Sequence, residues 1–211
     1  MNSTVLVRLA ALVPLLAAPL MGQDPGRGSQ SVFQAGDQIL LDVEGDSTLT
    51  HTFPVGPGPA VTLPVIGAIS LAGVPRGEVE PYLTTQLARY LKNPVVHAKA
   101  LVRLSILGEV ERPGFYAVPT DGVVSDALMA AGGPTREAKF TALEIERDGV
   151  RVWAGSALQQ AIAQGRTVDA MGLRSGDRII VPRRRDPEST IRILGMLATI
   201  PAAIFVITKA F

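Results

Sequence analysis

The chain has 211 residues, a formal net charge of +1 and no cysteine. This length allows one or two small cores, and the near-neutral charge argues against nucleic acid as a partner. The absence of cysteine excludes disulfides, thiolate metal sites, thiol catalysis and a lipid attached to a cysteine of this sequence.

The first segment, residues 1–22, is predicted to be a secretory signal peptide. Arg8 precedes an apolar run that ends at Met21, and this run has about the length of a signal-peptide core while being too short to span a bilayer. Two prolines in the run disfavour the alternative, a buried N-terminal helix. We place the cleavage after Gly22, and we interpret residues 23–32, where Gly, Pro, Ser and Gln gather, as a linker.

The next stretch combines short strands with one helix. "FQAGDQILLDV" predicts a turn at Gly36 and Asp37 followed by a strand, and "VTLPVIGAISL" predicts a hairpin that bends at Gly67. Apolar residues recur every four positions in "GEVEPYLTTQLARYLKNP", which predicts a helix ended by its Asn-Pro pair. The clearest strand covers residues 96–106, because apolar and polar residues alternate along it with Leu101 as the exception.

The second half of the folded part is predicted from its turns. "GEVERPGFYAVP" predicts a hairpin with a type II turn, since Pro presets a negative φ and Gly accepts the positive one. "VVSDALMAAGG" predicts a short helix ended by its two glycines, and "RSGDRIIVP" repeats the Gly-Asp turn before a strand. The body is therefore predicted to be α+β, in two lobes that meet near residues 101–108. The residues expected at structural turns are Pro113, Gly114, Gly132, Gly133, Gly176 and Asp177.

The order of these motifs resembles a known family. "AGDQILLDV", "VTLPVIGAISLAGV" and "LARYLKNPVV" are similar to the polysaccharide-export domain of outer-membrane polysaccharide export proteins. "LGEVERPGFYAVPTDGVVSDALMAAGGPT", followed by "LRSGDRIIVP", is similar to the soluble-ligand-binding β-grasp (SLBB) domain that comes next in that family. The resemblance implies a polysaccharide-export domain at residues 33–100 and one β-grasp domain at residues 101–185.

The resemblance also implies a function and partners. It implies a ring-forming channel component that exports capsular polysaccharide or exopolysaccharide across the bacterial envelope, together with an inner-membrane polysaccharide co-polymerase. Many members attach a lipid to a cysteine, which this sequence lacks, and larger members carry several β-grasp repeats where this sequence shows one. We therefore expect a shorter ring that is anchored by other means.

The last segment, residues 188–211, is predicted to be a C-terminal transmembrane helix. Residues 193–208 carry no charge, and these 16 residues rise about 24 Å as a helix against a hydrocarbon core of about 30 Å. At about 100° per residue the run has a bulky face, which suits lipid, and a small-residue face, which suits helix contacts or a lumen. A plain hydrophobic anchor is the alternative. The lipid face contains Ile193, Leu197, Ile200 and Ile204, and the small face contains Gly195, Thr199 and Ala202.

Charge placement around the tail favours the outer membrane. If a leader exports the body, residues 183–185, all arginine, and Arg192 lie on the exported side of the tail, with Lys209 beyond it. This arrangement opposes the positive-inside rule for an inner-membrane helix. We therefore expect an exported protein in the outer membrane with a periplasmic body; the alternative is an inner-membrane anchor with the body facing the periplasm.

The sequence offers no support for an enzyme. His51 falls in a Thr-rich loop and His97 on the polar face of a strand, and no nucleophile elbow, Walker loop, dinucleotide fingerprint or metal-ligand spacing occurs. Asp37 and Asp177 are more simply turn residues than the paired carboxylates of a glycoside hydrolase. No catalytic residue, cofactor or metal is expected. The second function to consider is a tail-anchored periplasmic carbohydrate-binding or scaffolding module without a pore.

Substitutions on the two faces of the tail are expected to have different effects. Gly195→Leu combined with Ala202→Leu should disrupt the ring and stop polymer export, because close helix approach requires small side chains. Ile200→Leu combined with Ile204→Leu should be nearly silent. Oligomer size in detergent and surface polysaccharide measure both effects, and equal behaviour of the two double mutants would leave the tail as an anchor only.

Overall fold

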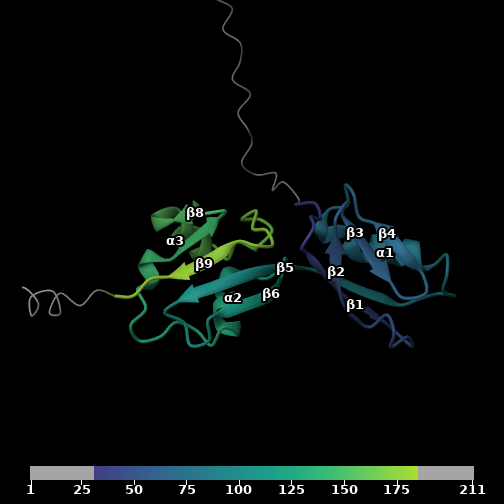
Figure 1. Ribbon diagram of the computed structural model, residues 1–211, viewed down its shortest axis with the longest axis horizontal. Coiled ribbons are helices and arrows are strands. Elements are labelled where there is room, and N and C mark those ends of the chain that lie inside the picture. The colour runs from purple at the N-terminus through teal and green to yellow at the C-terminus, as the bar shows by residue number, and fades with distance from the viewer. Residues whose placement is uncertain (1–30, 185–211) are drawn as a thin grey trace, which may run out of the picture.

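The computed structural model describes residues 31–184, which form two lobes joined by one long strand (Figure 1). The predicted signal peptide, most of the linker and the tail, with both of its faces, lie outside the described residues. Within 31–184, no helix combines the length and the apolar character needed to cross a membrane. The tail helix therefore stays a prediction from the sequence.

The first lobe is an antiparallel sheet with one covering helix. Its strands are β1 (Gln38–Val43), β2 (His51–Gly56), β3 (Ala60–Leu63) and β4 (Gly67–Ser70), and they pair in chain order. The predicted hairpin is present, because Leu63 pairs with Gly67 across the β3–β4 turn. A short 3-10 turn, η1 (Arg76–Glu78), leads into α1 (Val79–Leu87).

Helix α1 buries the face that its four-residue spacing predicts. Val79, Leu83 and Leu87 are at most 2% exposed and pack into the core of the first lobe. The helix ends at Leu87, well before the Asn-Pro pair expected to stop it, because the following residues continue as tighter turns with Tyr90 N–H donating to the Leu87 carbonyl. The predicted helix is confirmed and its predicted end is wrong.

One face of strand β5 (Val96–Gly108) contributes side chains to both hydrophobic cores. Its even-numbered residues from 96 to 100 pack into the first core, and those from 102 to 106 pack into the second. Leu101, the exception to the alternation, is 6% exposed and pairs with both Gln38 of β1 and Pro119 of the second lobe. It is buried because the two lobes meet beside it.

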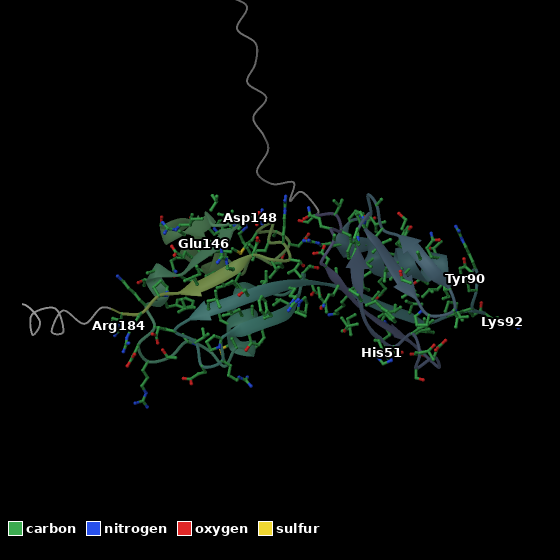
Figure 2. All side chains as sticks on the ribbon, in the orientation of Figure 1. His51, Tyr90, Lys92, Glu146, Asp148 and Arg184 are labelled. Carbon is green, nitrogen blue, oxygen red and sulfur yellow. The ribbon has the colours of Figure 1, made fainter. Side chains whose placement is uncertain are left out.

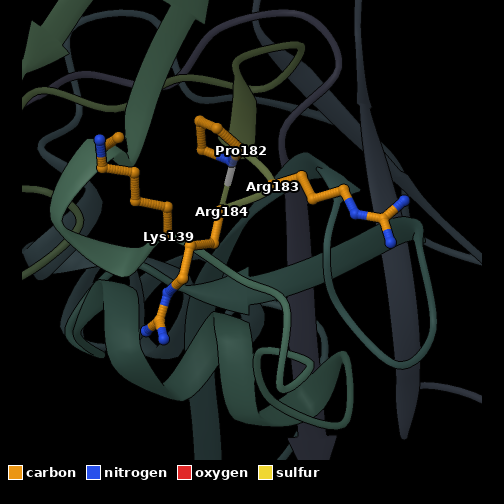
Figure 3. Close-up of a pocket in the computed structure, with 5 residues that line it drawn as sticks. Lys139, Pro182, Arg183 and Arg184 are labelled. Atoms are coloured by element: carbon orange, nitrogen blue, oxygen red, sulfur yellow. The ribbon is translucent and has the colours of Figure 1, made fainter. Parts of the chain in front are cut away.

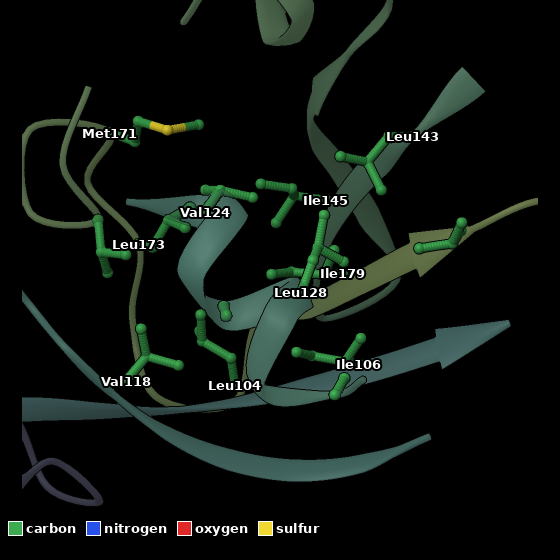
Figure 4. Packing of buried hydrophobic residues seen from close by; sticks show 14 of the residues in the cluster. Leu104, Ile106, Val118, Val124, Leu128, Leu143, Ile145, Met171, Leu173 and Ile179 are labelled. Carbon is green, nitrogen blue, oxygen red and sulfur yellow. The ribbon is translucent and has the colours of Figure 1, made fainter. Parts of the chain in front are cut away.

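The second lobe is a mixed sheet with helices packed against it. β6 (Gly114–Pro119) and β9 (Arg178–Val181) flank β5, antiparallel and parallel respectively, and β7 (Glu144–Arg147) and β8 (Val150–Ala154) continue from β9. The remaining elements are α2 (Val124–Ala130), η2 (Phe140–Ala142) and α3 (Gly155–Ala163). Figure 4 shows the core, in which side chains of α2 pack onto those of β5, β7 and β9. The α+β class predicted from the sequence is confirmed.

The predicted type II turn at Pro113 and Gly114 is wrong. Gly114 is the first residue of β6, pairs with Ile106, and is not among the residues with positive φ. The connection from β5 is longer than a tight turn, because its backbone bonds to the loop after α2: Glu111 N–H donates to the Gly133 carbonyl at 3.1 Å. Long-range contacts, rather than Pro-Gly chemistry, shape this connection.

The glycine pair that ends α2 behaves as predicted, with φ values of +86° at Gly132 and +83° at Gly133. A Cβ on Gly132 would meet the Cβ of Glu111 at 2.8 Å, whereas a Cβ on Gly133 would meet only Met129 Sδ, at 3.7 Å. Gly132 therefore allows both the backbone conformation and the close approach of the β5–β6 connection.

Three alanine substitutions separate these effects. Gly133→Ala should lower the free energy of unfolding by about 1 kcal/mol through its positive φ, and Gly132→Ala by about 2–4 kcal/mol because a steric clash is added. Gly114→Ala should change it by less than about 0.5 kcal/mol. Urea unfolding of the three variants measures the order, and a cost at Gly114 equal to that at Gly132 would contradict the observed geometry.

Candidate functional site

Two Gly-Asp turns of the same form start β1 and β9. In the second turn, Gly176 has φ +98° and the Asp177 carboxylate accepts the Arg174 N–H at 2.8 Å. In the first, the glycine has φ +93° and the Asp37 carboxylate accepts the Gln34 N–H at 3.0 Å. Each aspartate thus closes its own turn three residues back, as the sequence predicts.

Each aspartate is also paired with an arginine from another element. Arg76 of η1 donates through Nε and Nη2 to Asp37 Oδ2, at 3.1 and 2.8 Å. Arg147 of β7 donates through Nε and Nη2 to the two oxygens of Asp177, at 2.7 and 2.8 Å. The hydrogen bonds to Asp177 raise the pKa of Arg147.

The first pair is fully buried and joins the two lobes. Arg76 and Asp37 are 1% and 0% exposed. From the second lobe, the Leu173 carbonyl accepts a hydrogen bond from Arg76 Nη1 at 3.0 Å, and Ser175 Oγ donates to Asp37 Oδ1 at 2.8 Å. Asp169 adds a longer contact to Arg76 Nη1 at 3.5 Å. We call this set, Asp37, Arg76, Asp169, Leu173 and Ser175, the junction network.

The two turns lie end to end along one edge of β5. Gln38 of β1 pairs with Leu101, and Arg178 of β9 pairs with Ser105. Between them, the carbonyl of Arg103 accepts the N–H of the second turn's glycine at 2.9 Å, and its own N–H donates to Ser175 Oγ at 3.0 Å. Strands β1 and β9 therefore leave the junction in opposite directions, antiparallel and parallel to β5, and each belongs to a different lobe.

A surface hollow of about 300 Å³ opens beside the junction network. The Arg103 guanidinium lies 4.6 Å from the centre of the Phe115 ring, and Phe115 is 68% exposed. Both glycines of the matched turns line the hollow. An aromatic ring exposed next to a cation is typical of a contact surface.

The connection between β5 and β6 is held by hydrogen bonds. Arg112 N–H donates to the Ala131 carbonyl at 2.9 Å, and Tyr116 Oη donates to the Arg112 carbonyl at 2.6 Å. Pro113 is exposed, as is Met129 of α2 at 67%. Pro113 in the loop and Met129 in α2 therefore present exposed apolar groups.

The described residues do not bring together catalytic or metal-binding groups. Between residues 31 and 184, no group of three or more His, Cys, Asp or Glu side chains is placed so that it could hold a metal ion. His97 Nδ1 lies 3.8 Å from Glu80 Oε2, and both side chains are exposed. Asp37 and Asp177 are each held by an arginine, which leaves neither carboxylate free to act on a substrate.

Comparison with known proteins identifies both lobes. A family model described as a polysaccharide biosynthesis/export protein matches residues 26–100, and a model described as an SLBB domain matches residues 103–155. The chain thus contains a polysaccharide biosynthesis/export domain followed by an SLBB domain. The core of the second lobe continues to Val181, so this lobe is longer than the segment that the SLBB model matches.

Curated relatives carry names that agree with this family. The chain is 26% identical over 169 residues to "Polysialic acid transport protein KpsD" of Escherichia coli, an alignment that covers 78% of this chain and 30% of the relative. It is 29% identical over 160 residues to "EPS I polysaccharide export outer membrane protein EpsA" of Ralstonia nicotianae, covering 73% of this chain and 42% of the relative. The chain thus spans less than half the length of these two relatives.

The sequence analysis named Asp37 and Asp177, the aspartates of the two ion pairs, and missed their arginine partners. Arg76 and Arg147 lie 39 and 30 residues from their partners, in stretches that read as ordinary loop and strand. The matched Gly-Asp turns were the available signal, because an aspartate that starts a buried strand needs a compensating charge.

We expect substitution of the two arginines to lower the free energy of unfolding by different amounts. Arg76→Leu leaves a carboxylate buried without its partner and should lower the free energy of unfolding by about 3–5 kcal/mol. Arg147→Leu should cost about 1–3 kcal/mol, because Arg147 is 27% exposed and water reaches the site. Arg89→Leu, at an exposed position, serves as the control within about 0.5 kcal/mol. Chemical denaturation measures all three, and an Arg76→Leu cost equal to that of the control would contradict the role of the junction network.

Proposed function

We propose that this chain is a ring-forming channel component for the export of capsular polysaccharide or exopolysaccharide across the bacterial envelope. The observation that carries the proposal is the order of the two matched domains, a polysaccharide biosynthesis/export domain followed by an SLBB domain. Two relatives, named as a polysialic acid transport protein and a polysaccharide export outer membrane protein, support it.

The rigidity of the junction supports a ring. A ring closes only when every subunit repeats the same rotation relative to the next, because a head-to-tail contact that does not close gives an open filament. A hinge between the lobes would let that rotation vary. The junction network opposes such a hinge, since opening it would break the hydrogen bonds that the Leu173 carbonyl and the Ser175 hydroxyl make to the Arg76–Asp37 pair.

The proposed partners follow from the same assignment. They are the polysaccharide, further copies of this chain, an inner-membrane polysaccharide co-polymerase and the membrane itself, with no nucleic acid. The competing function is a tail-anchored periplasmic carbohydrate-binding or scaffolding module without a pore. Both functions use the two lobes, and only the channel requires a closed oligomer.

We propose that the protein is exported and inserts its tail in the outer membrane, with the body in the periplasm. Separation of the two membranes on a density gradient should recover the full chain with outer-membrane markers. Recovery with inner-membrane markers would instead support the anchored alternative that faces the periplasm.

The channel and the module differ in oligomer size and in export. Deleting the gene should abolish surface polysaccharide, the full chain should restore it, and the detergent-extracted chain should run as a closed oligomer of one size. Arg76→Leu should reduce both oligomer and export, while the exposed control Arg89→Leu should change neither. A chain that restores export while extracted only as a monomer would contradict the ring.

A further inference from the structure

Cationic side chains surround the point where the chain leaves the second lobe. Lys139, Arg183 and Arg184 line a hollow of about 330 Å³ next to Pro182. In Figure 3 the three side chains extend in different directions around the proline. They therefore form a collar around the exit of the chain and do not converge on one small anion. We call Lys139, Arg183 and Arg184 the exit collar.

The backbone of the exit collar is fixed by pairing between two segments. Lys139 N–H donates to the Pro182 carbonyl at 2.8 Å, and Arg184 N–H donates to the Glu137 carbonyl at 2.6 Å. Arg183 also forms an ion pair with Glu137. Among residues 31–184, no carboxylate pairs with Lys139 or Arg184, so these two exposed cations are available to an external anion.

The exit collar lies at one end of the long axis of the molecule. Figure 2 places Arg184 at this end, while Tyr90 and Lys92 lie at the other. Strand β9 runs toward the collar and ends at Val181 (Figure 1). Any flat surface that meets this end of the body meets the collar.

The sequence after the exit collar limits how far the body can lie from a membrane. Eight residues, 185–192, separate Arg184 from the uncharged run at 193–208, and eight residues span at most about 30 Å when fully extended. If that run inserts in a bilayer, as the proposed function requires, the collar lies within this distance of the headgroups. Residues 185–192 carry two arginines and two acids, so this segment is neutral and the positive charge of this end lies in the collar itself.

We propose that the exit collar docks on an anionic lipid surface and so turns the C-terminal end of the second lobe toward the membrane. Lysine and arginine at a membrane surface are attracted to anionic headgroups, and each contributes about fivefold to the binding constant. Lys139 and Arg184, which pair with no carboxylate among residues 31–184, point in different directions (Figure 3) and suit separate headgroups. The inference rests on membrane insertion of the tail and adds to it the lipid class and the orientation of the body.

Lysine labelling on the full chain tests the proposal with an internal control. The chain is incorporated into nanodiscs of phosphatidylcholine alone or of phosphatidylcholine with phosphatidylglycerol, and a water-soluble amine reagent is followed by mass spectrometry. The labelling rate of Lys139 should fall about fivefold in the anionic discs, whereas Lys92, exposed at the opposite end, should label equally in both. Arg184→Gln should remove much of the Lys139 protection, and Arg89→Gln should not.

Each other outcome overturns the proposal in a distinguishable way. Equal labelling of Lys139 in the two discs, with the chain incorporated in both, overturns the lipid docking and leaves the proposed function intact. Protection of Lys139 by inorganic phosphate at constant ionic strength in phosphatidylcholine discs would make the hollow a phosphate site and overturn lipid docking. Failure of the chain to enter either disc would overturn both the docking and the membrane part of the proposed function.

Discussion

The buried ion pair between Asp37 and Arg76 is the interaction on which the two-lobed structure depends. Removing two charges from water costs several kcal/mol per ion, and this cost is offset only when the remaining hydrogen-bonding atoms are satisfied. Here the Leu173 carbonyl and the Ser175 hydroxyl, both from the second lobe, complete the pair. Separating the lobes therefore breaks the hydrogen bonds that Leu173 and Ser175 make to the pair, and this cost holds the two lobes together.

The same constraint explains the course of β5. One face of this strand covers both cores, and on one of its edges the two Gly-Asp turns start β1 and β9 in opposite directions. The two turns have the same backbone form. In each, the aspartate carboxylate accepts a backbone N–H that closes the turn and also pairs with an arginine. Their difference lies in burial: the pair at the junction is closed to water, and the pair in the second lobe is partly open.

Local sequence patterns were sufficient for the elements and insufficient for the contacts between them. The alternation along β5, the β3–β4 hairpin and the apolar spacing of α1 follow from short-range chemistry, and the structure confirms them. The turn predicted at Pro113 and Gly114 is wrong because hydrogen bonds to the residues after α2 hold this loop. Local sequence rules do not include such long-range contacts. Arg76 and Arg147 escaped notice for the same reason, since their partners lie far along the chain.

The measurement that tests the account most directly is the distance distribution between the lobes. The chain has no cysteine, so Tyr90→Cys and Val150→Cys, at positions 63% and 66% exposed in different lobes, give two unique sites for spin labels. Double electron–electron resonance on the full chain should show one narrow distance, which broadens when Arg76→Leu is added and stays narrow when Arg89→Leu is added. A broad distribution without the Arg76 substitution, or a narrow one that Arg76→Leu leaves unchanged, would contradict the junction network as the element that fixes the lobes.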